Sequence, residues 1–223
     1  MEMIVQNLVD NYLANSGKMI RPQLISLFGD IFRLSSKEVA LISKAAEMIH
    51  NASLIHDDVI DEAQLRRGKK ALNQIVSNSQ AVLAGDFLLA KVISELVDAR
   101  QFGILKTLAE TLQSIVEGEF LQDDLKNKTV ISQEELFEVA AKKTGALLAW
   151  CCSATAIVAQ KDPEIVQKCS SIGLKLGMVF QLIDDNLDYS DETGKDFGKD
   201  LKEGLINMTT MNLITLYPEL YYP

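Results

Sequence analysis

The spacing of apolar residues along this chain is typical of α-helices over most of its length. Apolar side chains recur every three to four residues, and no segment shows the apolar–polar alternation of a half-buried strand. The periodicity predicts helices over residues 5–15, 21–32, 80–96 and 102–125, with breaks at residues 15–17, 67–79, 126–131 and 190–204. We therefore expect an all-α protein.

Local signals at helix starts predict the remaining helices. Ser35 with Glu38, and Ser132 with Glu135, have the spacing of a capping box. The first box predicts a helix that runs to about residue 61, and the second a helix through residue 143 towards residue 159. Pro163 after Asp162 predicts the start of a helix that reaches residue 188. Residues 205–216 are apolar enough to pack as a further helix.

Composition supports one domain over residues 1–223, because 48% of the residues are hydrophobic and no linker or repeat interrupts them. The net charge of −9 argues against nucleic acid and against an anionic membrane surface as partners. The three cysteines, Cys151, Cys152 and Cys169, are expected to be reduced thiols in the core. The N-terminus lacks a signal-peptide pattern, and the longest uncharged run, residues 145–159, is short for a membrane span. We expect a cytoplasmic protein without a transmembrane segment.

Two aspartate clusters of the same form, Asp-Asp-x-x-Asp, are the most informative feature of the sequence. The first consists of Asp57, Asp58 and Asp61, and the second of Asp184, Asp185 and Asp188. On a helix, positions i and i+4 share a face, so each cluster can present two carboxylates side by side. Both clusters interrupt apolar helix patterns, where carboxylates are costly unless a cation neutralises them.

The chemistry predicted for these clusters is the binding of a diphosphate through magnesium. Oxygen ligands suit Mg²⁺, which usually joins a few carboxylates to substrate phosphates. Basic residues follow both clusters: Arg66, Arg67, Lys69 and Lys70 after the first, and Lys195, Lys199 and Lys202 after the second. Carboxylates for the metal followed by cations for phosphate are the groups that such a site needs. The charged break at residues 190–204 would suit a flap over it.

At this point the motifs match a known family. They are, in chain order, Gly17–Pro22, Leu54–Asp61, Arg66–Gly68, Ala84–Leu88, Gly118-Glu119 with Gln122, Lys143–Gly145, Phe180–Asp185, Gly194–Asp196 and Asp200-Leu201. The chain resembles the trans-isoprenyl diphosphate synthases of the polyprenyl synthetase family, and among them the medium- and long-chain, octaprenyl-type members. Each motif alone is weak, but all of them in this order are very specific.

The resemblance implies a helical barrel of the isoprenoid-synthase type around a deep central cavity, usually paired as a homodimer. It implies Mg²⁺-dependent, head-to-tail condensation of isopentenyl diphosphate onto an allylic diphosphate, such as farnesyl diphosphate, to give a trans-polyprenyl diphosphate. Such products include the side chains of quinones. Two or three Mg²⁺ ions would bind together with the diphosphate.

The resemblance also implies roles for particular residues. The two aspartate clusters would hold the metal, with Asp57, Asp61 and Asp184 as ligands and Asp58, Asp185 and Asp188 in support. Arg66, Lys143 and Lys195 match residues that bind the allylic diphosphate. Lys18, Arg21, His50 and Arg67 match the isopentenyl diphosphate pocket. Thr144 and Gln181 match polar groups at the centre where the carbocation forms, where oxygen lone pairs can stabilise positive charge.

Product length is expected to depend on the residues just before the first cluster. Ala52 and Ser53, five and four positions before Asp57, are small, and on a helix that presents Asp57 at the mouth of the cavity they would lie further inside. Nothing at these positions blocks a growing chain, which agrees with a long product.

Three alternatives were weighed against this interpretation. A non-catalytic subunit of a heteromeric synthase would not need both clusters complete, and a class I terpene cyclase would not need the isopentenyl diphosphate residues. A di-iron carboxylate protein needs two Glu-x-x-His motifs, whereas this chain has one, from Glu47 to His50. The chain also departs from the family at Leu205, where a lysine is usual, and at its early C-terminus. We therefore expect the natural chain to be longer, or this end to be poorly packed.

Overall fold

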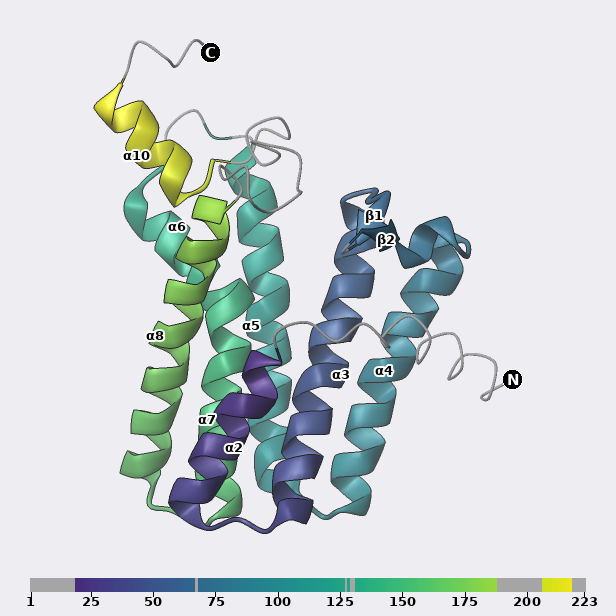
Figure 1. Ribbon diagram of the computed structural model, residues 1–223, viewed down its shortest axis with the longest axis vertical. Helices are drawn as coiled ribbons and strands as arrows, with labels where there is room; N and C mark the ends of the chain where they lie inside the picture. The colour runs from purple at the N-terminus through teal and green to yellow at the C-terminus, as the bar shows by residue number, and fades with distance from the viewer. Residues whose placement is uncertain (1–18, 67, 127, 129–130, 188–205, 218–223) are drawn as a thin grey trace. The chain divides into compact units, whose positions relative to one another are not determined.

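The computed structural model describes residues 19–66, 68–126, 128, 131–187 and 206–217 (Figure 1). Lys18, Arg67, Asp188, Lys195, the predicted helix 5–15 and the predicted break 190–204 therefore lie outside the described residues. The chain divides into two compact units. Unit 1 contains Met1–Lys106 and Ala154–Lys161, and unit 2 contains Thr107–Ser153 and Asp162–Pro223.

Unit 1 is built on three helices, α2 (Ile20–Phe32), α3 (Ser36–Ile60) and α4 (Asn78–Asp98). Helices α3 and α4 lie side by side along their lengths, and α2 packs on α3 (Figure 1). The fully buried side chains of α3 and α4 form the core of the unit. They are Ile42, Ala46, Ile49, Ala52 and Ile55 on α3, and Ala81, Ala84, Leu88, Val92 and Leu96 on α4.

Capping boxes begin three of the helices, as the local sequence dictates. The boxes predicted at Ser35 and Ser132 are confirmed, because each serine side chain accepts a hydrogen bond from the N3 amide and each glutamate carboxylate accepts one from the serine amide. A third box, Ser77 with Gln80, begins α4 and was missed by the sequence analysis. Its signal was present, since glutamine at N3 serves as well as glutamate.

A small hairpin follows α3, where the sequence analysis predicted an irregular break. Strands β1 (Leu65–Arg66) and β2 (Lys69–Lys70) pair antiparallel, with Leu65 opposite Lys70 and Arg66 opposite Lys69. Gly68 in the turn has a φ of 75°, a conformation that favours glycine. A short 3₁₀ helix, η1 (Leu72–Gln74), leads from the hairpin towards α4. The expectation of no strand was wrong here because two-residue strands are too short to show alternation.

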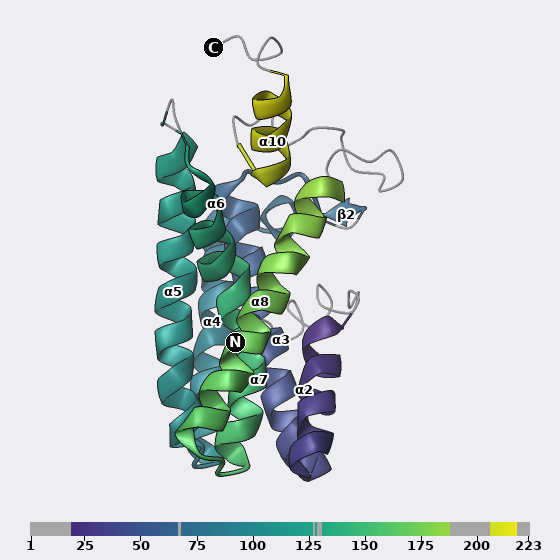
Figure 2. The same ribbon diagram turned by 90° about the vertical axis from the view of Figure 1, so that its left-hand side faces the viewer.

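The second unit contains most of α5 (Phe102–Lys126), α6 (Gln133–Ala140), the π-helical segment η2 (Ala141–Gly145), the first part of α7 (Ala146–Val158), α8 (Pro163–Leu187) and α10 (Met208–Leu216). The helix predicted from Ser132 towards residue 159 is therefore present, with one wide π turn inside it. Figure 2 shows α10 close to α6 and α8. Buried Leu125, Leu136 and Met208 form a core cluster there, with Leu182 packed against it.

Helix α8 approaches η2 and α7 closely because glycines stand at the contacts. A Cβ atom added to Gly177 would lie 2.5 Å from the Cα of Gly145, and one added to Gly173 would lie 2.3 Å from the carbonyl oxygen of Leu148. No side chain larger than hydrogen fits at such distances. The glycines therefore bring the backbone of α8 against the π segment, which carries Lys143 and Thr144.

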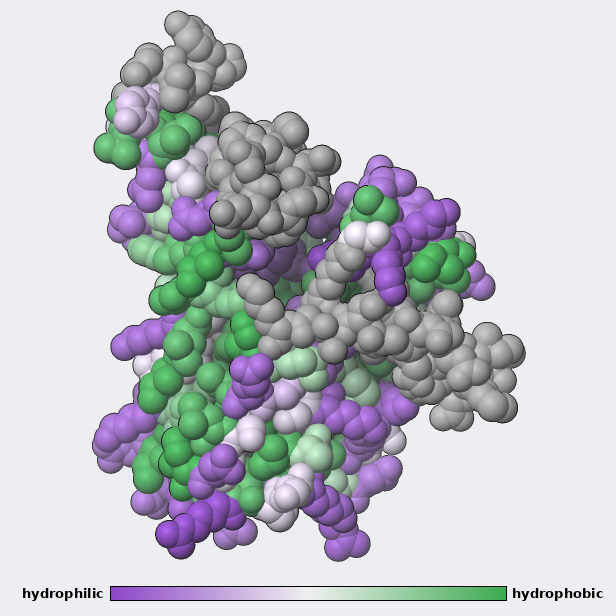
Figure 3. Space-filling model, in the orientation of Figure 1, coloured by the Kyte–Doolittle hydropathy of each residue, from purple (hydrophilic) through white to green (hydrophobic). Residues whose placement is uncertain are grey.

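Exposed apolar side chains occur on several of the described helices, among them α8 and α4. On α8, they occur at intervals of three, four or seven residues and form one stripe, visible at the left of Figure 3: Ile165, Ile172, Leu176, Val179 and Ile183. On α4, the exposed apolar residues Val82, Leu83, Ile93 and Val97 lie on the face away from its buried side chains. None of the described helices is long and apolar enough to cross a membrane.

Candidate functional site

The first aspartate cluster lies at the C-terminal end of α3, and its three members have different surroundings. Asp57 is half-buried in the last turn, Asp58 is fully buried with an exposure of 0%, and Asp61 is the exposed C-cap residue. The amide of Asp61 donates a hydrogen bond to the carbonyl oxygen of Asp57, 2.8 Å away, which continues the helical register to the cap. Asp57 and Asp61 are therefore one turn apart.

The fully buried carboxylate of Asp58 forms an ion pair with Arg66 of the β-hairpin, whose side chain is 32% exposed. The Nε atom of Arg66 donates to Asp58 Oδ1 over 2.9 Å, and its Nη2 atom donates to the same oxygen. Asn73 donates from Nδ2 to the backbone carbonyl of Asp58 over 2.9 Å. Removing one member of such a pair leaves an uncompensated buried charge. Asp58 therefore holds the hairpin against the end of α3, and the metal-supporting role expected for it stays a prediction.

The carboxylates of the first cluster fit a magnesium ion that is bound together with a phosphate. Among the residues that the structure describes, no group of three or more His, Cys, Asp or Glu side chains is arranged to hold a metal alone. Mg²⁺ in phosphate sites usually takes one or two carboxylates, with the phosphate and water supplying the other oxygens. Asp57 and Asp61, one turn apart at the end of α3, are two carboxylates of this kind. In the second cluster the corresponding pair is Asp184 with Asp188, and Asp188 lies outside the described residues.

Other predicted site residues of unit 1 lie along α2 and α3. Arg21 on α2 pairs with Glu47 on α3, with Nη1 3.7 Å from Oε1. His50 is half-buried one turn after Glu47. This arrangement ties the residues expected in the isopentenyl diphosphate pocket to neighbouring helices, and their role remains a prediction.

The side chain of His56 on α3 packs against α4. A Cβ atom added to Gly85 would lie 2.2 Å from His56 Nε2, so the ring packs directly on the backbone of α4. The same nitrogen lies 3.1 Å from the carbonyl oxygen of Val82 and 3.5 Å from Asp86 Oδ1. Asp86 therefore serves the contact between α3 and α4.

The two residues expected to control product length have different positions. Ala52 is fully buried and belongs to the buried stripe of α3. Ser53 is half-buried, and its hydroxyl donates to the carbonyl oxygens of Ile49 and His50 over 3.2 and 3.0 Å. Of the two, Ser53 is the residue with a side chain at the accessible surface of unit 1. A large side chain at Ala52 would instead enter the core.

In unit 2, a chain of hydrogen bonds joins Thr144, Gln181 and Asp185. Thr144 Oγ1 donates to Gln181 Oε1 over 2.5 Å, and Gln181 Nε2 donates to Asp185 Oδ1 over 2.8 Å. An ionised carboxylate only accepts hydrogen bonds, so Asp185 orients the amide with its oxygen towards Thr144. The structure thus brings together two residues expected at the cation-forming centre and one member of the second cluster. Asp184, next to Asp185, is exposed.

Two neighbouring lysines on the π segment form separate ion pairs with α5. Lys143 Nζ lies 2.8 and 2.9 Å from the two carboxylate oxygens of Glu119. Lys142 Nζ lies 3.0 Å from Glu117 and 3.2 Å from Glu138, and Glu117 is the larger cause of a raised pKa of Lys142.

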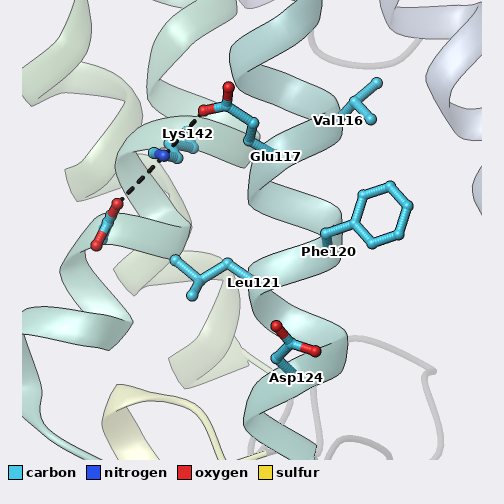
Figure 4. A pocket seen from close by; sticks show the side chains of 7 residues that line it. Val116, Glu117, Phe120, Leu121, Asp124 and Lys142 are labelled. Carbon is cyan, nitrogen blue, oxygen red and sulfur yellow. Dashed lines mark hydrogen bonds and ion pairs between the residues drawn. The ribbon is translucent and has the colours of Figure 1, made fainter.

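An open groove of about 520 Å³ lies beside α5, and Lys142 of the π segment is one of its lining residues (Figure 4). Its lining consists of Val116, Glu117, Phe120, Leu121, Asp124, Glu138 and Lys142. Figure 4 shows Phe120 pointing away from Lys142, on the far side of the α5 helix. Of the predicted site residues that the structure describes, none lines this groove.

The sequence analysis assigned no role to two residues that contact predicted site residues. Glu119 was noted only as part of a motif, and Asn73 lies in a segment expected to be irregular. The signal for Glu119 was present in the sequence: it belongs to the Gly118-Glu119 motif, and its partner Lys143 belongs to the Lys-Thr-Gly motif of the same family pattern. No local signal identified Asn73, because its partner is fifteen residues away and is a backbone oxygen.

Comparison with known proteins agrees with the motifs. The family model described as Polyprenyl synthetase matches residues 2–219. The human All trans-polyprenyl-diphosphate synthase PDSS1 is 34% identical over 97% of this chain and 54% of its own length, and the octaprenyl diphosphate synthase of Escherichia coli strain K12 is 34% identical over 86% and 60%.

Solved structures agree as well. The polyprenyl synthase of Caulobacter crescentus CB15, complexed with calcium and isoprenyl diphosphate, has a TM-score of 0.89 and 34% identity over 97% of this chain and 67% of that chain. The chain spans between half and two thirds of the length of the two curated relatives. The all-α fold expected from the sequence is confirmed, and the chain belongs to the polyprenyl synthetase family.

Proposed function

We propose that this protein elongates prenyl chains, by condensing isopentenyl diphosphate head to tail with an allylic diphosphate such as farnesyl diphosphate. The product would be a trans-polyprenyl diphosphate, of the kind that becomes a quinone side chain. Membership of the family supports the reaction class. The observation that carries the proposal furthest is the hydrogen-bond chain Thr144–Gln181–Asp185, which links cation-stabilising oxygens to an aspartate cluster.

The reaction begins when the bond between the allylic carbon and the diphosphate oxygen breaks and its electron pair leaves with the diphosphate. The double bond of isopentenyl diphosphate then attacks the allylic cation, and a proton is lost. Fixed positive groups favour the first step because they stabilise charge that develops on the leaving group. Mg²⁺ held by Asp57, Asp61 and Asp184, with Asp58, Asp185 and Asp188 in support, would supply Lewis-acid stabilisation of that diphosphate.

Besides holding the metal, the protein residues have three tasks in this scheme. Arg66, Lys143 and Lys195 bind the allylic diphosphate, and Lys18, Arg21, His50 and Arg67 bind isopentenyl diphosphate. Thr144 and Gln181 direct oxygen lone pairs at the cation. The hydrogen bonds to Asp185 and Thr144 fix the Gln181 amide before substrate arrives, so little reorganisation is needed during the reaction.

Direct assay of elongation tests the proposal. The purified protein is incubated with farnesyl diphosphate, isopentenyl diphosphate and Mg²⁺, and the products are sized. We expect elongation in the wild type and a loss of about 100-fold or more in kcat for Asp57→Ala and for Asp184→Ala. Asp123→Ala is the matched control, since Asp123 is an exposed aspartate outside both clusters that pairs with Lys126 one turn away. Near-normal turnover in both cluster variants would refute the mechanism, and an inactive wild type would favour a non-catalytic subunit.

Product length provides a second test of the same function. Ser53→Phe places a ring at the accessible surface of unit 1, and we expect it to shorten the product while the protein keeps its wild-type melting temperature. Ala52→Phe overpacks the core between α3 and its neighbours, at a cost of about 1–3 kcal/mol in folding stability. The melting temperature of this variant is therefore measured together with its product length. An unchanged product from a stable, active Ser53→Phe variant would show that the chain does not grow past Ser53.

We further propose that the protein is a homodimer and that the exposed apolar face of α4 contributes to the interface. Val82, Leu83, Ile93 and Val97 form this face, opposite the buried side of the helix. Exposed apolar patches of this kind are typical of association surfaces. A cytoplasmic location remains the expectation from the sequence.

A further inference from the structure

We propose that Glu119 is a positioning residue that holds the ammonium group of Lys143 in place for the allylic diphosphate. The inference rests on the proposed function, since it takes Lys143 to be a diphosphate-binding residue. It goes beyond that function by assigning a role to a carboxylate on α5 that lies outside both aspartate clusters.

The contact between the two side chains is close and partly shielded from water. Lys143 Nζ lies 2.8 Å from Oε1 and 2.9 Å from Oε2 of Glu119, so the ammonium group is held by both carboxylate oxygens. The Lys143 and Glu119 side chains are only 26% and 28% exposed. A pair in this position is less screened by solvent than an ion pair on the open surface.

The backbone around this pair is in direct contact. A Cβ atom added to Gly118 would lie 2.7 Å from the backbone nitrogen of Lys143 and 2.9 Å from Lys142 Cβ. Helix α5 therefore touches the π segment at the residue before Glu119, and the carboxylate extends from a long, regular helix. A group fixed on such an element can hold a flexible partner to within the small tolerance that binding sites require.

Lysine needs this kind of support more than arginine does. Its ammonium is a compact point charge at the end of a flexible four-carbon stem, and ordering that stem costs rotamer entropy. Three N–H donors are present, so an ammonium anchored on Glu119 can still donate to a phosphate oxygen. The next residue, Thr144, is oriented in turn by Gln181 on α8. The π segment thus presents two adjacent functional side chains, each oriented by a different helix.

The neighbouring pair provides a built-in comparison. Glu117 on α5 binds Lys142 over 3.0 Å and so connects the same two elements, but at the edge of the open groove (Figure 4). If Glu119 merely fastened α5 to the π segment, loss of either glutamate would have a similar effect on activity. If Glu119 positions Lys143, only its loss alters diphosphate binding.

The experiment compares Glu119→Gln with Glu117→Gln. We expect Glu119→Gln to lower kcat/KM for the allylic substrate by about five- to tenfold, and Glu117→Gln to stay within about twofold of the wild type. Glu119→Gln should also weaken the binding of inorganic diphosphate with Mg²⁺, measured by calorimetry, more than Glu117→Gln does. Thermal melts followed by circular dichroism report separately on any loss of stability.

A double-mutant cycle separates positioning from a structural effect. In a Lys143→Gln background, Glu119→Gln should cause no further loss in diphosphate binding, because the group on which it acts is gone. Additive losses would overturn the proposal, and so would tighter diphosphate binding by Glu119→Gln, which would show that Glu119 competes with the ligand. Diphosphate binding does not depend on turnover, so the proposal is tested even if the wild type fails to elongate prenyl chains, an outcome that would refute only the proposed function.

Discussion

Asp57 and Asp58 are neighbours of the same chemical type, yet the structure gives them different surroundings. Asp58 pairs with Arg66 and is fully buried, whereas Asp57 is half-buried, one turn before exposed Asp61. The buried residues of α3 explain the difference. Ala52, Ile55 and Asp58 follow one another at intervals of three, so Asp58 continues the buried stripe.

The spacing of three from Ala52 through Ile55 to Asp58 is a local hint that Asp58 is buried at the end of α3. A wheel drawn over the whole helix does not show it, because the buried positions shift around the helix along its length. The partner of Asp58 was less accessible to prediction, because the approach of Arg66 depends on a hairpin whose strands have two residues each. The contact between Asn73 and the Asp58 backbone depends on the same hairpin.

The cysteines lead to a prediction about thiol reactivity. Cys151, Cys152 and Cys169 are buried thiols outside any disulfide, as expected from the sequence, and burial, with a smaller contribution from Cys169, raises the pKa of Cys152 to about 12. Burial also raises the pKa of Cys169. Because the thiolate is the reactive form, we expect all three thiols to resist a thiol reagent at pH 8 in the native protein and to react at once in denaturant. Rapid labelling of any of them in the folded protein would contradict this prediction.

Among the helices, α6 has the clearest pH dependence. Its N3 residue, Glu135, pairs with Lys128 and accepts from the Ser132 amide, and these contacts lower its pKa from 4.5 to about 2. A carboxyl group whose pKa is lower in the folded state adds stability above its unfolded pKa and loses it as the pH falls through the folded value. The contribution of Glu135 is therefore complete above about pH 5 and lost towards pH 2.

Glu135→Gln tests this pH window. Glutamine keeps the capping box, as Gln80 does beside Ser77, but removes the charge that binds Lys128. We expect the variant to melt a little below the wild type at pH 7 and at the same temperature near pH 2. Glu134→Gln is the control, because it removes a charge from the same turn and leaves the Lys128–Glu135 pair intact. A melting difference that persists unchanged at pH 2 would contradict the prediction.

Helix positions were the most predictable part of the fold. Long amphipathic repeats and capping boxes are local, and the described helices begin and end within a few residues of their predicted limits. The π segment could not be predicted, because its wide turn depends on contacts with α5 at Gly118 and with α8 at Gly177. Those contacts join residues 24 or more positions apart in the chain, which single-sequence periodicity does not reveal.

For the molecule as a whole, the proposed homodimer gives a measurable expectation. Ile93→Glu places a charge on the exposed apolar face of α4 and should convert a dimer, with twice the 24.7 kDa of one chain, to a monomer. Light scattering after size exclusion measures this directly. Ile172→Glu is the matched control, because it makes the same change on the exposed stripe of α8. Loss of the dimer in Ile172→Glu but not in Ile93→Glu would assign the interface to α8 instead.

The π segment also sets the phase of the helical run in which it lies. A single wide turn takes in about one extra residue, so every position after it is rotated by about 100° relative to an uninterrupted helix. Leu136 and Ala140 before the turn, and Leu147 and Leu148 after it, are all buried with this offset in place. A deletion of one residue within residues 141–145 would make the segment a regular α-helix. Either Leu136 and Ala140 or Leu147 and Leu148 would then rotate out of their buried positions. The number of residues in this segment is therefore under a constraint of its own, independent of which side chains bind a ligand.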